Sequence, residues 1–379
     1  MDQPAREATI NSSLRTLLVR VGLIFFGFAL AMVLCEAALQ VHYRVIQGEW
    51  RWAYKASELH FFQWHPNLVG TPRPGAVGMS GRKTVTINSL GFRGPEISTK
   101  KRPGVVRIVT LGGSSTFGTQ VSDDEAWPRQ LERRLGRDFE VVNLGVPGYG
   151  TVENLIQTAF VLSDLNPDIA IYYEGWNDLR NMHVRPLAPD YSNFHGKQQL
   201  TDLDIVSVDT NSRLATAFYM RSWILGSMLS RLDAVPSFEG SPDKLTDRTD
   251  ARAVGLYSRN LRSIVALCRS QGVRPIMVPH LLNYEILTSD QPYFWIPYVK
   301  TKDLRKAMNG YNEVMKGATH ELAVDFVESV LETAFGSADF VDEGHFNGPG
   351  SRKFAGLLSD YLQSHPTIPR QIAKTTSAE

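Results

Sequence analysis

Four short segments of the chain carry groups that could catalyse acyl transfer together. Ser114 follows two glycines, and a serine becomes a nucleophile when a neighbouring base takes its proton. Histidine is the usual base, and His345 has Asp342 three positions before it to fix its tautomer and stabilise the imidazolium. An oxyanion would find donors in the N–H groups of Ser114 and Gly148 and in the amide of Asn177.

The chain from about Lys100 onward predicts the elements that position these segments. Apolar, β-branched runs typical of buried strands alternate with segments typical of helices. The predicted strands are Val105–Leu111, Phe139–Val142, Asp168–Tyr173, Arg274–Pro279 and Val324–Val327. The predicted helices are Asp123–Leu135, Val152–Leu165, Leu214–Leu232, Ala253–Gln271 and Gly350–Gln363.

Strands separated by helices indicate a mostly parallel central sheet covered on both faces, the three-layer α/β/α class. In such a sheet ligands bind beyond the carboxyl ends of the strands. Ser114, Gly148 and Asn177 follow the first three predicted strands, and the Asp342–His345 segment precedes the last predicted helix. We therefore expect all five groups to meet at one rim of the sheet.

The four segments resemble, in kind and order, the sequence blocks of the SGNH hydrolase superfamily, the GDSL-type esterases and lipases. Ser114 matches the block I nucleophile, Gly148 the block II glycine, Asn177 the block III asparagine, and Asp342 with His345 the block V Asp-x-x-His. The resemblance implies a flavodoxin-like fold, a Ser–His–Asp triad and an oxyanion hole of Ser114, Gly148 and Asn177. It implies no metal and no organic cofactor.

The resemblance covers about Val105 to Leu362 and has one departure. The family usually has Asp before the nucleophile, where this chain has Gly113. The flanking residues, with the upstream segment Asn88–Gly94 (NSLGFRG), are similar to a bacterial subgroup that has one N-terminal membrane helix.

An apolar segment near the N-terminus fits such a helix. Val21–Cys35 carries no charge, and extension to Leu17 and Val41 gives about 25 residues, interrupted mainly by Arg20 and Glu36. A membrane span needs roughly 20 apolar residues. Three alternatives compete with an anchor. Cys35–Ala37 fit the cleavage site of a signal peptide poorly, and Leu34 stands where a lipoprotein would have a small residue before Cys35. The third alternative is a buried core helix. We expect an uncleaved signal anchor.

The expected organisation follows from that anchor. Residues 1–20 form a short cytoplasmic tail, 21–41 the transmembrane helix, 42–100 a connector, 101–365 the hydrolase domain and 366–379 a flexible tail. Basic residues flank the helix almost equally, but long domains translocate with little regard to charge. We expect a single-pass protein of the cytoplasmic membrane with its catalytic domain on the extracytoplasmic side.

Composition and charge exclude several classes of protein. The 379 residues are 43% hydrophobic and 21% charged, which excludes a disordered or collagenous chain. A formal charge of +1 gives no field that would attract nucleic acid. Two cysteines, Cys35 and Cys268, are too few for a disulfide scaffold, and the nine histidines are scattered.

Several of these residues also have structural interpretations. Gly and Ser are ordinary turn and cap residues, so Ser114 by itself is weak evidence for a nucleophile. A second set of polar and aromatic residues could line a cleft or simply pack in the fold: Trp176, Arg180, His183, Tyr191, His195, His280, Tyr293, Phe294, Trp295 and Tyr298.

The expected reaction is hydrolysis of an ester through an acyl-serine, with O-acyl or O-acetyl groups on an envelope carbohydrate as the substrate class that the resemblance suggests. Three alternatives stay open. They are an O-acyltransferase acting on a polysaccharide, a lysophospholipase or lipase, and a catalytically silent glycan-binding or assembly component, to which Gly113 points. The sequence leaves the oligomeric state open.

Overall fold

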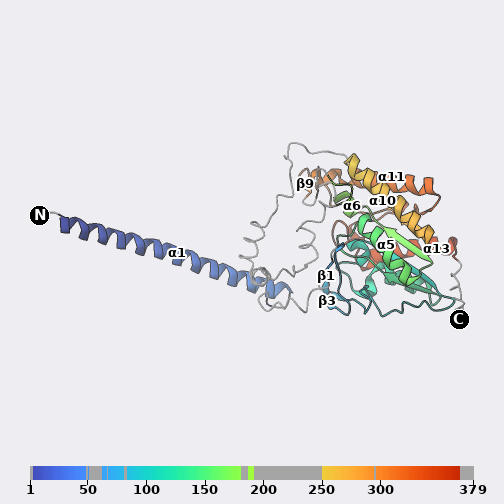
Figure 1. Cartoon of the computed structure of the whole chain (residues 1–379), viewed down its shortest axis with the longest axis horizontal. Helices are drawn as coiled ribbons and strands as arrows, with labels where there is room; N and C mark the ends of the chain where they lie inside the picture. Colours follow the sequence, from blue (N-terminus) through green and yellow to red (C-terminus); the bar gives the residue numbers. More distant parts are fainter. Residues whose placement is uncertain are drawn as a thin grey trace, which may run out of the picture. The chain divides into compact units, whose positions relative to one another are not determined.

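The computed structural model describes residues 3–47, 50, 62–65, 67–80, 83–180, 187–191, 250–293 and 296–367 (Figure 1). The chain divides into two units, one of Met1–Ala56 with Val208–Val235 and the other of Ser57–Ser207 with Pro236–Glu379. The helix predicted at 214–232 and most of the predicted C-terminal tail, from 368 to 379, lie outside the described residues.

The N-terminal apolar segment lies within α1 (Gln3–Gln47), an uninterrupted helix. Its stretch Arg15–Val45 is long and apolar enough to cross a membrane. The consecutive side chains of Ile24, Phe25 and Phe26 are exposed by 70%, 70% and 67%, so the apolar surface surrounds the helix. By length and composition α1 could be a membrane anchor or a signal sequence.

A parallel sheet organises the second unit. Its strands are β5 (Val106–Gly112), β6 (Phe139–Asn143), β7 (Ile169–Tyr173), β8 (Arg274–Val278) and β11 (Asp325–Phe326). Their order is β11-β8-β7-β5-β6 and every pairing is parallel. This is the flavodoxin-like order, whose switch point between β5 and β7 is where ligands bind. The predicted fold class is confirmed.

Helices cover both faces of the sheet. The central strands β5 and β7 are therefore buried along their whole length. Alternate residues of β5 point to opposite faces: Val109 and Leu111 join one core cluster, and Val106 and Ile108 join the other. The first cluster includes residues of α5 (Thr151–Leu165), α10 (Ala251–Ser270) and α11 (Leu304–Leu322). The second includes residues of α4 (Trp127–Leu135) and α13 (Gly348–Ser364).

Two helical elements differ from the sequence prediction. Helix α11 is not predicted from the sequence, because Gly310 and Gly317 interrupt its helical pattern, although its buried residues recur at helical spacing. The predicted helix 123–135 is two elements, the 3₁₀ turn η2 (Asp123–Glu125) and α4, with extended backbone at Ala126. Pro128 has no N–H for a continuous helix, so it is tolerated only in the first turn of a new one.

The segment before β5 packs on the sheet unit. It contains two antiparallel hairpins, β1 (Phe62–His65) with β2 (Val69–Pro72), and β3 (Val77–Ser80) with β4 (Lys83–Thr86). Its Val85 and Ile87 are buried in a cluster with Phe117. The Tyr149 hydroxyl donates to the carbonyl of Gly70 at 2.6 Å. Residues of this segment therefore contribute to the core beside the rim of the sheet.

Candidate active site

The candidate residues meet at the carboxyl-terminal rim of the sheet. Ser114 begins the short helix α3 (Ser114–Phe117) directly after β5, and Asn177 lies in α6 (Trp176–Arg180) directly after β7. Gly148 follows β6, and the Asp342–His345 loop leads into α13. Gly112 makes the turn into α3 with a φ of +155°, beside the Tyr173 carbonyl and the Thr116 side chain.

His345 lies between Ser114 and Asp342. Its Nε2 is 2.8 Å from Ser114 Oγ, and its Nδ1 is 2.8 Å from Asp342 Oδ2 and 2.9 Å from Oδ1. Because a carboxylate can only accept, Nδ1 carries the proton of the neutral ring and Nε2 is left as the acceptor for the serine hydroxyl. This tautomer is the one that a general base needs.

Asp342 is held by donors from several directions. The backbone N–H groups of Gly344 and His345 donate to Oδ1 at 3.0 and 2.9 Å, and the amide of Gln120 donates to Oδ2 at 3.0 Å. Burial acts to raise the pKa of Asp342, but the hydrogen bonds and charge of His345 and the backbone donors outweigh it, so the pKa lies below its ordinary value. The carboxylate is ionised at neutral pH.

Two further contacts join α3 to its surroundings. The Ser115 hydroxyl donates to the carbonyl of Gly344 at 2.7 Å, within the loop that carries His345. The indole N–H of Trp127 donates to the carbonyl of Ser115 at 3.1 Å. Ser115 and Trp127 are both buried, and the bond from Ser115 ties α3 to the loop that carries His345.

Three donors are available near the serine. Within the described part of the chain, the N–H groups of Ser114 and Gly148 have no hydrogen-bond acceptor. The Asn177 side chain gives one of its N–H groups to the carbonyl of Tyr149, with Nδ2 2.7 Å from the oxygen, which leaves the other N–H for a ligand. Gly148 has a φ of +84°, a conformation that glycine adopts without strain.

Gly113 stands where the resemblance leads one to expect Asp. A Cβ added to Gly113 would overlap the amide nitrogen of Asn177 and would come within 3.0 Å of the Tyr149 carbonyl oxygen. The space that a side chain would need at position 113 is therefore occupied by Asn177. The glycine permits this close approach, so the departure from the usual sequence has a local structural reason.

A buried polar network lies behind Asn177. Asp178 is 1% exposed and accepts from the N–H and hydroxyl of Thr151 at 3.2 and 2.5 Å. Burial raises the pKa of Asp178 to about 7 despite these hydrogen bonds, and burial together with the charge of Asp178 raises that of Glu174 well above its ordinary value. Asn260 of α10 donates to the same Thr151 hydroxyl at 3.0 Å, so the network links α6, α5 and α10.

Two other residues singled out in the sequence make contacts within the fold. His280 is 3% exposed and stacks on Tyr173 with ring centroids 4.4 Å apart; burial, aided by the charge of His345, lowers its pKa to about 3. A neutral imidazole is expected there. Tyr293 is buried and donates to the carboxylate of Glu343. His183, His195, Phe294 and Trp295 lie outside the described residues.

Sequence reasoning missed Gln120 and Ser115, because nothing in their local pattern indicates contacts with residues more than 200 positions away. The same is true of the network around Asp178, although the Asn177-Asp178 pair marks the strand end that it supports. Among the described residues, no group of three His, Cys, Asp or Glu side chains is arranged to hold a metal ion.

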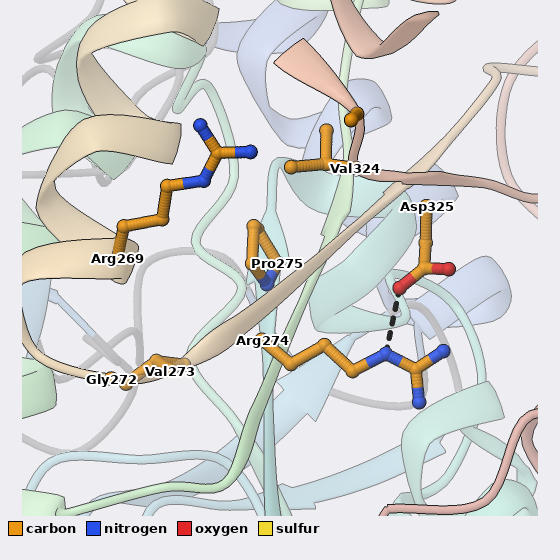
Figure 2. Close-up of a pocket in the computed structure, with 8 residues that line it drawn as sticks. Arg269, Gly272, Val273, Arg274, Pro275, Val324 and Asp325 are labelled. Atoms are coloured by element: carbon orange, nitrogen blue, oxygen red, sulfur yellow. Dashed lines mark hydrogen bonds and ion pairs between the residues drawn. The ribbon is translucent and has the colours of Figure 1, made fainter.

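A cavity of about 340 Å³ lies at the amino-terminal ends of strands β8 and β11, away from the carboxyl-terminal rim (Figure 2). It is lined by residues from the end of α10 and from the amino-terminal ends of β8 and β11: Arg269, Gly272, Val273, Arg274, Pro275, Ala323, Val324 and Asp325. Arg274 Nε lies 2.7 Å from Asp325 Oδ2, and Arg269 donates to the carbonyl of Leu322. Both guanidinium groups have internal partners, and the cavity is not part of the rim that holds Ser114.

A Ser–His–Asp arrangement at the rim of a flavodoxin-like sheet is the kind of site that serine-dependent hydrolases use. The sequence profile of the GDSL-like Lipase/Acylhydrolase family matches residues 110–367, more than half of the chain. The chain belongs to this family, and it is a hydrolase of ester bonds.

Several solved structures are similar at low identity. They include a GDSL-like lipase from Bacteroides thetaiotaomicron, with 12% identity and a TM-score of 0.39, covering 69% of this chain and 89% of that one. An aryl esterase from M. smegmatis gives 15% identity and a TM-score of 0.40, covering 69% and 99%. An acetyl xylan esterase has 10% identity and a TM-score of 0.39, and the match covers 68% of this chain and 100% of that one. No curated protein matches the chain.

Proposed function

We propose that the protein is a serine esterase that removes an acyl group through an acyl-Ser114 intermediate. The observation that supports this is the continuous line of contacts from Ser114 Oγ to His345 Nε2 at 2.8 Å and from His345 Nδ1 to Asp342 at 2.8 Å. The nucleophile, its base and the group that orients the base have the geometry that acyl transfer requires.

In the proposed reaction His345 takes the proton of Ser114 as the serine oxygen attacks the ester carbonyl. The imidazolium then gives this proton to the leaving alcohol, and the acyl group stays on Ser114. In the second half, His345 takes a proton from water as the water oxygen attacks the acyl carbon. The bond between this carbon and Ser114 Oγ then breaks, the carboxylic acid leaves, and the imidazolium returns the proton to Ser114. Asp342 remains ionised and stabilises the imidazolium in both halves.

The oxyanion formed in each half would accept from the N–H groups of Ser114 and Gly148 and from the free N–H of the Asn177 amide. A donor that is fixed before the reaction costs no reorganisation when the charge develops. The hydrogen bond from Asn177 to Tyr149 and the close fit of Asn177 over Gly113 support such a fixed donor.

For the substrate, we propose short O-acyl groups, acetyl above all, on a carbohydrate of the cell envelope. The apolar helix α1 supports an envelope location, as a single-pass anchor of the cytoplasmic membrane with the hydrolase unit on the extracytoplasmic side. We also propose that residues 42–100 form the connector between the anchor and the hydrolase domain, and that residues 101–365 form that domain.

The test is hydrolysis of p-nitrophenyl acetate and of longer-chain p-nitrophenyl esters by the full chain in detergent. Ser114→Ala and His345→Ala are expected to abolish turnover. The exposed residues Ser270 on α10 and His320 on α11 provide matched controls, and Ser270→Ala and His320→Ala should keep wild-type rates.

The pattern of rates decides among the possible functions. A preference for acetyl supports the proposed substrate class, whereas a preference for long chains indicates a lipase. Transfer of acetyl to an added glycan, faster than hydrolysis, would identify an acyltransferase. Absence of turnover in the wild-type protein, with no labelling of Ser114 by a fluorophosphonate, would overturn the proposal.

A further inference from the structure

Gln120 has an unusual backbone conformation beside the acid of the site. Its φ is +67°, in the left-handed region that residues other than glycine rarely adopt. Its side-chain amide donates to Asp342 Oδ2 at 3.0 Å, the same oxygen that lies 2.8 Å from His345 Nδ1. A strained residue of this kind persists only where its surroundings hold it in place.

The segment before β5 supplies that support. The N–H of Gln120 donates to the hydroxyl of Ser80, at the end of β3, at 2.9 Å. This bond connects the β3–β4 hairpin to the loop that follows the nucleophile helix.

Arg93 holds the rest of the same loop. Its buried guanidinium donates to the carbonyls of Phe117, Gly118 and Val121 at 2.5, 2.5 and 2.7 Å. Its Nε also lies 3.1 Å from a carboxylate oxygen of Asp123. The backbone is therefore anchored on both sides of Gln120.

We propose that Gln120 is a positioning residue for Asp342, held in its strained conformation by Ser80 of the β3–β4 hairpin. With the Gln120 amide on one carboxylate oxygen and two backbone N–H groups on the other, the carboxylate cannot rotate away from His345. Its consequence for the rate rests on the proposed function, but its effect on the Asp342–His345 pair does not.

The Gln120 amide also reduces the negative potential of Asp342 at the imidazole, since its N–H end faces the carboxylate. Removal of the amide should stabilise the imidazolium, and a carboxylate in its place should stabilise it more. Among the residues that the structure describes, the other titratable groups that act on the pair are His280, which interacts with His345, and Tyr293 with its partner Glu343. These three are unchanged in the variants below.

The experiment uses the full chain in detergent with isotope-labelled histidine and follows the NMR titration of the His345 ring, assigned by its loss in His345→Ala. Gln120→Gly keeps the positive φ without strain and removes the whole side chain with its amide. Gln120→Glu adds a charge at the same place. Gln363→Glu, on the exposed side of α13, is the control for an added carboxylate.

We expect the His345 titration to move to higher pH in Gln120→Glu, to move less in Gln120→Gly, and to stay unchanged in Gln363→Glu. Ser80→Ala should give a smaller rise. We expect kcat/KM for an acetyl ester to fall about tenfold in Gln120→Gly, because the carboxylate gains rotational freedom.

A titration midpoint that matches wild type in both Gln120 variants would show that the amide does not act on the Asp342 carboxylate, and it would overturn the positioning role even if the protein is an active esterase. If the midpoint moves as expected in a protein that hydrolyses no ester, the positioning role stands and the proposed function fails. The two proposals are thus tested by separate readouts.

Discussion

The amide of Asn177 occupies the space above Gly113 that any side chain at position 113 would need. The two residues follow different strands, β7 and β5, which are neighbours in the sheet. Gly113 precedes the proposed nucleophile, and Asn177 is a proposed oxyanion donor. Their packing therefore couples the backbone at the serine to the position of a donor.

This coupling predicts the effect of Gly113→Ala. The added methyl group should displace the Asn177 amide, remove its bond to Tyr149 and lower kcat/KM about 10²-fold, the usual loss for one oxyanion donor. The measurement is ester hydrolysis together with the thermal unfolding midpoint. Gly255→Ala, on an exposed turn of α10 with no atom near the added methyl, should keep wild-type activity. Wild-type activity in Gly113→Ala would contradict the account.

The candidate site could be predicted largely because its residues follow the ends of strands. Each of the strands β5, β6 and β7 is a short apolar run, and the turn chemistry after each run is visible in the sequence. The contacts that hold the site could not be predicted in the same way. Gln120 reaches Asp342 across 222 positions and Ser115 reaches Gly344 across 229, and neither has a local pattern that indicates its partner.

Part of the fold was also beyond the sequence pattern. Gly310 and Gly317 weaken the helical signal of α11 in the sequence. The spacing of its apolar residues could be interpreted only once the helix was seen to pack in the core of the sheet unit. The segment before β5 has short strands with few apolar residues, and its packing depends on single polar anchors such as Arg93 and Lys101.

Asp342→Asn tests the proposed role of the carboxylate. An amide at position 342 can donate to Nδ1 and so favour the tautomer with its proton on Nε2, facing the serine hydroxyl. We expect kcat/KM to fall by about 10⁴. Asp360→Asn, on the exposed side of α13, should have no effect on the same assay. A loss of less than tenfold in Asp342→Asn would show that the tautomer is set by another group.

The buried carboxyl of Asp178 predicts a pH-dependent stability. Burial raises its pKa from 3.8 to about 7, so the folded state binds this proton more tightly than the unfolded state. The resulting stability is present in full below 3.8 and is lost as the pH rises through about 7.

Asp178→Asn removes this titration while it keeps an acceptor for Thr151. The difference in unfolding temperature, Asp178→Asn minus wild type, should be larger at about pH 8 than at about pH 5, because only wild type loses stability as the pH rises. The exposed Asp164→Asn should show no such change. A difference from wild type that is the same at both pH values would contradict the shifted pKa of Asp178.

Lys101 and Asp168 form a buried ion pair between the segment before β5 and the sheet, with Nζ 2.8 Å from the carboxylate. Lys101→Ala removes the cation that pairs with the buried charge of Asp168, although the Arg107 N–H still donates to this carboxylate at 2.7 Å, and it should lower the free energy of unfolding by about 3–5 kcal/mol. Lys100→Ala, at the exposed neighbouring position, should change it by less than about 0.5 kcal/mol. Denaturant titration of both variants measures the difference, and equal stabilities would show that the pair contributes little.

The central claim is that Ser114 is a nucleophile activated by His345. Reaction of the full chain with a fluorophosphonate, followed by peptide mass spectrometry, tests it most directly. The account predicts one label, on Ser114, and at least a hundredfold slower labelling in His345→Ala, because the base contributes about 10²–10⁴ to such a step. Labelling of another serine, or equal rates with and without His345, would contradict it.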